Sequence, residues 1–178
     1  MNASTPVFIT VMASTVGLAF FVYFKNPSRL ANRTFSLLSL AVAGWTAGTW
    51  AGSYFAETQA GLRLGRVAFA MAILMAYALL VFLHVFPASF RLPRSFPVTV
   101  FGTLAAALTL VSVTTPWIMT ALTIDEGNLK VQYGPLYPLF AVYILACVGY
   151  SFSTICRKIH VARGVERLQL KYLFAGLL

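Results

Sequence analysis

The sequence is poor in charged residues, above all in acidic ones. Only 10% of its 178 residues are charged, and just four are Asp or Glu. A soluble domain carries roughly a quarter of charged residues. The shortage, with 60% hydrophobic residues and a mean hydropathy of +0.82, therefore excludes a soluble enzyme and a coiled coil. The only two cysteines, Cys147 and Cys156, lie in or beside an apolar stretch, which excludes an extracellular disulfide scaffold.

The 17 charged residues gather in five short intervals, and long uncharged stretches separate them. The uncharged runs measure 24, 23, 24, 30 and 26 residues, followed by a last run of 7. A helix needs about 20 apolar residues to cross a bilayer. The pattern therefore predicts an all-α membrane protein, a polytopic transmembrane helix bundle that forms a single domain over residues 1–178. The expected spans are about 7–24, 35–55, 67–86, 97–121 and 135–155, with a partial sixth span at 172–178 that indicates a C-terminally truncated chain.

The charges also predict an orientation. The first, third and fifth intervals (25–33, 91–94 and 157–171) hold ten basic residues and one acidic residue. The second and fourth (57–66 and 125–130) hold three of each. Because basic residues collect on the cytoplasmic side of short loops, we expect the N-terminus outside. This asymmetry explains the whole net charge of +9, so the lipid bilayer, and no nucleic acid, is the expected partner.

The stretch between the fourth and fifth spans predicts a small outer β-hairpin. Apolar residues alternate with polar ones from Leu122 to Tyr133, on both sides of a Gly-containing turn. Two strands alone are marginal in water, so we expect the hairpin to lie on the outer face of the bundle. Pro116 should kink or loosen the outer end of the fourth span.

The segment 157–172 has the periodicity of an amphipathic helix. Val161, Val165, Leu168 and Tyr172 share one arc of a helical wheel. A basic helix at the cytoplasmic face is expected to lie against anionic headgroups. The predicted membrane-surface cations of this connector are Arg157, Lys158, Arg163, Arg167 and Lys171.

Small residues form a stripe in the second span. Gly44, Gly48 and Gly52 recur every four residues, which stacks them on one helix face where another backbone can approach closely. Packing within the bundle is the favoured interpretation and dimerisation is the alternative. Four aromatic residues are candidates to face a ligand, although core packing is again favoured for them: Trp45, Trp50, Tyr77 and Tyr143.

Catalytic chemistry has few candidate residues. The five predicted spans contain no Asp, Glu, Lys or Arg, and His84 lies close to the end of its span. The sequence shows no metal-ligand spacing, no Gly-rich phosphate loop and no nucleophile with an evident base. We therefore predict no catalytic, cofactor or metal site. An uncharged interior lined with aromatic and hydroxyl groups favours an unknown apolar or amphiphilic ligand, or helix movement as the signal.

Four stretches in sequence resemble the N-terminal seven-transmembrane region of bacterial signal-transduction histidine kinases, which also precedes diguanylate cyclase outputs. The first is the loop and helix start Asn26-Pro27 with Asn32-Arg33-Thr34-Phe35 and Trp45. The second is Leu62-Arg63-Leu64-Gly65-Arg66 leading to Phe86-Pro87. The third is Tyr133-Gly134-Pro135-Leu136-Tyr137-Pro138, and the fourth is Ala162-Arg163-Gly164-Val165-Glu166-Arg167 up to Tyr172.

The resemblance implies a membrane-embedded sensory input domain of a two-component histidine kinase in the bacterial inner membrane. It also implies a homodimer formed through the full-length kinase, and a cytoplasmic output module that this chain does not contain. The chain itself is then not an enzyme. The alternative is a small transporter or transporter subunit, which requires a buried charge or an interrupted helix beyond Leu178; a lipid-modifying enzyme requires His or carboxylates there.

Overall fold

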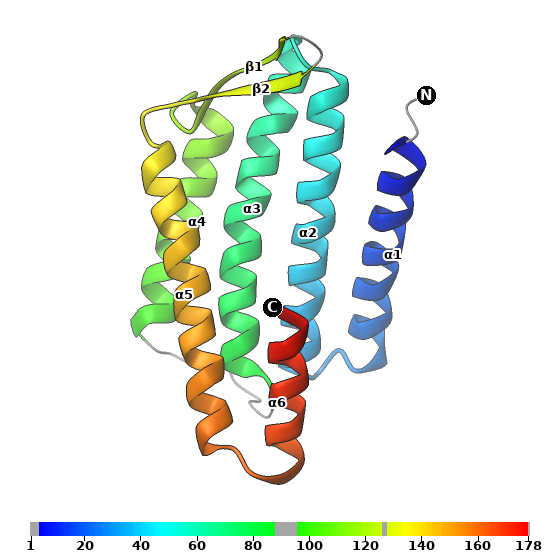
Figure 1. Cartoon of the computed structure of the whole chain (residues 1–178), viewed down its shortest axis with the longest axis vertical. Helices are drawn as coiled ribbons and strands as arrows, with labels where there is room; N and C mark the ends of the chain where they lie inside the picture. The colour runs from blue at the N-terminus through cyan, green and yellow to red at the C-terminus, as the bar shows by residue number, and fades with distance from the viewer. Residues whose placement is uncertain (1–3, 88–95, 126–127, 178) are drawn as a thin grey trace.

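A computed structural model describes residues 4–87, 96–125 and 128–177. The helices lie side by side and run alternately up and down, and the strands cross one end of the bundle (Figure 1). This confirms the helical bundle with its small hairpin. The elements are α1 (Ser4–Lys25), α2 (Leu30–Tyr54), α3 (Gln59–Val85), α4 (Phe96–Thr114), β1 (Met119–Asp125), β2 (Asn128–Tyr133), α5 (Tyr137–Val161) and α6 (Gly164–Leu177).

The two ends of the bundle differ in charge. The α1–α2 and α5–α6 connections lie at one end, which we call the basic end because it carries the cations of 25–33 and 157–163 (Figure 1). The hairpin lies at the opposite end, which we call the hairpin end. Arg91 and Arg94, which were predicted for the basic end, lie outside the described residues, as do Glu126 and Gly127 of the hairpin turn.

Four of the described helices, α1, α3, α4 and α5, are long and apolar enough to cross a membrane. The prediction of five such spans is not confirmed, because α2 falls outside this set. With 25 residues, α2 is roughly 37 Å long, which is enough to cross a bilayer. Its residues are not apolar enough to place it among the candidate spans. Its buried positions are small or polar because α1 and α3 cover it: the Ser36 hydroxyl donates to the Ala19 carbonyl at 2.8 Å, and Asn32 Nδ2 donates to the Val22 carbonyl at 3.1 Å.

The predicted fourth span, 97–121, is too long at its C-terminal end. Helix α4 ends at Thr114, and Pro116 follows it in the connection to β1 instead of kinking the helix. A proline disfavours helical backbone at the preceding residue, so the helix ends there. The hairpin accordingly starts at Met119, before the predicted Leu122, and pairs in antiparallel register with Leu122 opposite Val131.

The hairpin packs across the end of the bundle and not along its side (Figure 1). The Glu57 backbone N–H donates to the Leu122 carbonyl at 3.3 Å, and Glu57 Oε1 accepts from the Ile124 N–H at 3.3 Å. Arg66 Nε of α3 donates to the Met119 carbonyl at 3.3 Å. These contacts tie β1 to the α2–α3 connection and to α3 itself.

The predicted connector 157–172 is not one helix. Helix α5 continues to Val161, the chain turns, and α6 starts at Gly164, whose φ of 59° is a conformation that glycine adopts without strain. The four residues of the predicted apolar arc are divided between two helices, because Val161 ends α5 while Val165, Leu168 and Tyr172 lie on α6. All four side chains are exposed, and their contact with the membrane stays a prediction. Leu170 is buried in a cluster with Ile155 of α5 and Phe82 of α3, and Leu173 and Phe174 are partly buried beside this cluster. The predicted partial span 172–178 is therefore the second half of α6.

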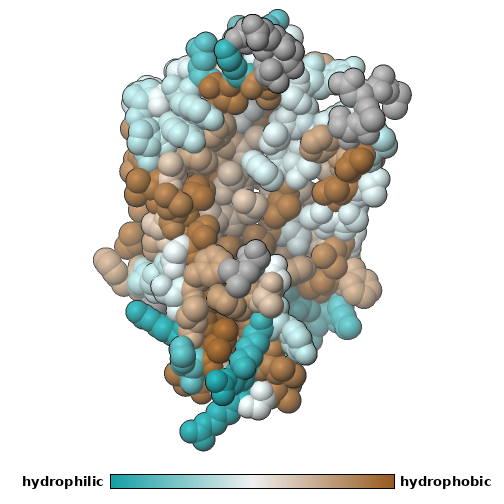
Figure 2. All heavy atoms as spheres, viewed as in Figure 1, coloured by the Kyte–Doolittle hydropathy of each residue, from teal (hydrophilic) through white to brown (hydrophobic). Residues whose placement is uncertain are grey.

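Helix α3 is the centre of the bundle and contacts α2, α4, α5 and β1. Its Ile73, Leu80 and Val85 are fully buried and pack with Cys147 of α5. Large apolar side chains such as Phe24, Leu110 and Leu145 are exposed around the outside. Figure 2 shows hydrophobic residues over the middle of the bundle, with hydrophilic residues at its two ends. Exposed apolar surface of this extent is typical of contact with lipid.

Candidate functional site

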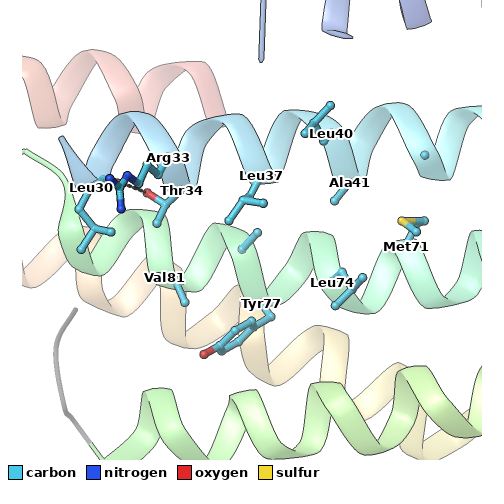
Figure 3. Close-up of a pocket in the computed structure, with 12 residues that line it drawn as sticks. Leu30, Arg33, Thr34, Leu37, Leu40, Ala41, Met71, Leu74, Tyr77 and Val81 are labelled. Atoms are coloured by element: carbon cyan, nitrogen blue, oxygen red, sulfur yellow. Dashed lines mark hydrogen bonds between the residues drawn. The ribbon is translucent and has the colours of Figure 1, made fainter. Parts of the chain in front are cut away.

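A groove of about 630 Å³ lies between α2 and α3. We call it the α2–α3 groove. It runs along both helices from Arg33 at the basic end towards Met71 in the middle of the bundle (Figure 3). Its lining is apolar apart from Arg33 and the hydroxyls of Thr34 and Tyr77. The lining residues are Leu30, Arg33, Thr34, Leu37, Leu40, Ala41, Gly44, Met71, Leu74, Tyr77, Ala78 and Val81.

Small residues create this groove. Ala41 and Gly44 of α2 and Ala78 of α3 all line the groove, so side-chain volume is missing along both of its walls. Met71 closes the far end: a Cβ atom at Gly44 would lie 3.0 Å from its Sδ atom. Thr34 adds little polarity, because its hydroxyl donates to the Leu30 carbonyl of its own helix at 3.0 Å (Figure 3). Arg33 is therefore the one charged group that lines the groove.

A second groove, of about 350 Å³, lies on the other side of α2 against α1. We call it the α1–α2 groove. Its walls are Ala19, Phe20, Tyr23 and Phe24 of α1. On α2 it shares three residues with the larger groove, namely Arg33, Leu37 and Leu40. The two grooves are thus neighbours that meet at the same arginine.

Tyr77 is the one predicted ligand-facing aromatic that lines the α2–α3 groove. Its ring extends from the groove towards α4 (Figure 3), where a Cβ atom at Gly102 would lie 2.7 Å from the Tyr77 hydroxyl. The absence of a side chain at Gly102 therefore fixes where this ring can lie. Tyr77 couples the wall of the groove to the position of α4.

The structure does not bring the other predicted aromatics to this groove. Trp45 is 43% exposed on the outside of α2, and Trp50 stacks on Tyr54 with ring centroids 6.0 Å apart. Tyr143 is buried in the core, where its hydroxyl donates to the Phe101 carbonyl at 3.3 Å. Their predicted contact with a ligand stays a prediction.

The glycine stripe packs within the chain. A Cβ atom at Gly48 would lie 3.0 to 3.2 Å from the Cβ, Cα and N atoms of Ala68, and one at Gly52 would lie 3.3 Å from the backbone N of Gly65. The stripe therefore brings the α2 backbone against the α3 backbone. Close approach of this kind is the usual role of small residues between membrane helices.

Lys158 holds the C-terminal end of α3, and we call this contact the lysine clamp. Its Nζ atom, on α5, donates to the carbonyl oxygens of Leu83, His84 and Phe86 at 2.8, 2.6 and 2.7 Å. The last carbonyls of a helix have no partner within the helix, and a lysine ammonium satisfies them while complementing the helix dipole.

The sequence analysis assigned Lys158 to the membrane surface together with Arg157, Arg163, Arg167 and Lys171. Those four side chains are exposed and Lys158 is half-buried. The stop at Phe86–Pro87 signals that α3 ends in unpaired carbonyls, but Lys158 lies 72 positions from Phe86. No local pattern identifies a partner at that distance. Contact of the exposed cations with headgroups stays a prediction.

Among the described residues, no group of three His, Cys, Asp or Glu side chains is placed to hold a metal ion. The His84 ring has structural contacts instead: its Nδ1 atom lies 3.0 Å from the Leu80 carbonyl oxygen, and the ring stacks on Tyr150 with centroids 5.5 Å apart. The α2–α3 groove thus offers apolar surface, the guanidinium group of Arg33 and the hydroxyls of Thr34 and Tyr77, and the lysine clamp lies outside it.

Comparison with known proteins identifies the chain. A family model described as the N-terminal 7TM region of histidine kinase matches residues 7–178. Comparisons with curated proteins and with solved structures give no match. The match covers nearly the whole chain, so this protein belongs to the family of N-terminal seven-transmembrane regions of histidine kinases.

Proposed function

We propose that this chain is the sensory input region of a two-component histidine kinase in the bacterial cytoplasmic membrane, and that it transmits a ligand or bilayer signal to a cytoplasmic output module. Family membership supports a sensory and non-catalytic role and gives the transporter alternative no support. The expected partner is a second copy, joined through the full-length kinase. The basic end faces the cytoplasm in this proposal, in keeping with the charge asymmetry.

The observation that carries the proposal is the position of α3. Met71, Leu74 and Tyr77 form one wall of the α2–α3 groove, and the same helix ends in the carbonyls that Lys158 of α5 holds. Helix α5 leads directly into α6, the last described helix. A change in the width of the groove that shifts α3 would therefore move α5 and α6 as well. Packed helices respond to such changes by small shifts between discrete arrangements.

Replacing Gly102 with alanine tests this coupling. The new Cβ atom would collide with the Tyr77 hydroxyl and push its ring or α4 aside. We expect the basal autophosphorylation rate of the full-length kinase in liposomes to change by about fivefold, in the range typical of coupled sites. Combining Gly102→Ala with Tyr77→Phe removes the nearest atom and leaves ring carbons at 3.0 and 3.3 Å, so the rate should return part of the way to wild type.

Gly149→Ala is the matched control, because a Cβ atom at Gly149 of α5 would meet nothing within 4 Å. This variant should leave the rate unchanged. A folded Gly102→Ala kinase with the wild-type rate, or equal effects of the two alanines, would contradict signal transmission through α3.

A further inference from the structure

The two grooves share a ridge and a cation. Leu37 and Leu40 of α2 line both grooves and separate them, and Arg33 lines both at the basic end. Both apolar grooves therefore start at the same guanidinium group. Their volumes of about 630 and 350 Å³ fall within the range of about 300 to 1,000 Å³ that is usual for ligand sites.

The shared end of the grooves is suited to an oxyanion. Arg33 is exposed and uses Nε to donate to the Pro27 carbonyl, which fixes the plane of the guanidinium group. The remaining N–H groups of an arginine form a planar fork that matches phosphate. Helix α2 also begins here, at Leu30, and its described N-cap residue, Arg29, supplies no side-chain cap. The positive end of the helix dipole thus adds to the charge of Arg33.

The length of the larger groove matches half of a bilayer. Gly44, near its far end, follows Arg33 by 11 positions on α2, which corresponds to about 16 Å of helix. Half of a hydrocarbon core is about 15 Å. The groove therefore spans the depth of one acyl chain, from the headgroup level to the middle of the bilayer.

We propose that the two grooves bind one anionic diacyl phospholipid from the leaflet at the basic end. One acyl chain lies in the α2–α3 groove and the other in the α1–α2 groove, on either side of Leu37 and Leu40. The phosphate lies against Arg33. This inference concerns binding alone: it goes beyond the proposed signalling function and does not depend on it.

Native mass spectrometry of the purified protein with phosphatidylglycerol tests the proposal. Arg33→Gln removes the charge that pairs with the phosphate and should weaken phosphatidylglycerol binding at least roughly tenfold. Arg33→Lys keeps the charge and should retain most of the affinity. Arg157→Gln is the matched control, because Arg157 is an exposed cation at the same end that lines neither groove; it should bind like wild type.

A second pair of variants tests the apolar part of the site. Ala78→Phe fills the α2–α3 groove and should weaken phosphatidylglycerol binding as strongly as Arg33→Gln. Ala106→Phe places the same ring on an exposed position of α4 and should have no effect. Phosphatidylcholine, which has no net charge, should bind roughly tenfold more weakly than phosphatidylglycerol to the wild type.

Several results would overturn the proposal. If the wild type bound phosphatidylcholine as tightly as phosphatidylglycerol, the lipid charge would have no role. If Arg157→Gln lost as much phosphatidylglycerol affinity as Arg33→Gln, the attraction would be to the basic end in general. Oleate binding as tightly as phosphatidylglycerol would contradict the assignment of two chains. Loss of a dimer in Ala78→Phe, with lipid binding intact, would show that a second copy occupies the groove.

Discussion

Replacing Gly48 with leucine is expected to force α2 away from α3 and to lower the free energy of unfolding by about 3 kcal/mol, the upper part of the usual range for overpacking. The reason is that the first added atom already meets the Ala68 backbone, with Cα at 3.1 Å and N at 3.2 Å. Backbone atoms in the centre of a helix cannot move aside as a flexible side chain does. The shift of the unfolding midpoint in dodecylmaltoside–SDS mixtures measures this loss.

Gly17→Leu is the matched control for this substitution. Gly17 lies on α1, where a Cβ atom would meet nothing within 4 Å and the position is exposed. A leucine there extends the lipid-facing surface and should leave the midpoint unchanged. If Gly48→Leu also unfolds at the wild-type midpoint, the close contact between α2 and α3 does not exist as described.

Replacing Lys158 with methionine is expected to lower the free energy of unfolding by about 2 to 3 kcal/mol. Methionine keeps an unbranched apolar side chain, one heavy atom shorter than lysine, but cannot donate. It therefore leaves the carbonyls of Leu83, His84 and Phe86 without the ammonium. Hydrogen bonds to a charged group are each worth about 1.5 to 3 kcal/mol, and water at the half-exposed helix end recovers part of that. The same mixed-micelle unfolding measures the change.

Arg157→Met separates the clamp from the general effect of removing a cation. Arg157 is the neighbouring residue on α5, and its side chain is exposed, so its replacement should change the stability by no more than about 0.5 kcal/mol. Lys158→Arg should fall between wild type and Lys158→Met, because a planar guanidinium fits three converging carbonyls less well than a compact ammonium does. Equal losses in Lys158→Met and Arg157→Met would contradict the clamp.

The positions of the helices could be predicted from the spacing of charges. Each predicted span overlaps one described helix, because a long uncharged stretch has few stable alternatives to a helix in lipid. The residues at which the helices begin and end were less predictable. Pro116 ends α4 rather than bending it, because a proline disfavours helical backbone at the residue before it.

The errors share one physical cause, which is that neighbours decide what a local pattern becomes. Helix α2 is shielded by α1 and α3, so Asn32 and Ser36 are tolerated there. In α6, the pattern of Val165 and Leu168 competes with that of Leu170 and Leu173, and the packing of α6 on a cluster that includes Ile155 decides between them. The sequence alone contains both patterns and does not select the one that is buried.

The candidate site was predicted in part. Gly44 and Tyr77 were singled out and both line the α2–α3 groove, because small and aromatic residues at helical spacing are what form and line such grooves. The sequence pattern places Arg33 among the orienting charges and in a family-like stretch, and Lys158 among the surface cations, but it assigns neither residue a binding partner. Both gain a specific position from residues distant in sequence: Arg33 from the convergence of α1, α2 and α3, and Lys158 from the end of α3.

Labelling from the two sides of the membrane tests most directly whether this bundle is an input region with its basic end in the cytoplasm. Ser28, in the α1–α2 connection, and Gln132, on β2, are exposed at opposite ends. Each is changed to cysteine in a chain whose Cys147 and Cys156 are replaced by alanine. A membrane-impermeant maleimide applied to intact spheroplasts should label Gln132→Cys alone, and should label Ser28→Cys only after lysis. Labelling of Ser28→Cys in intact spheroplasts would place the basic end outside and contradict the input function.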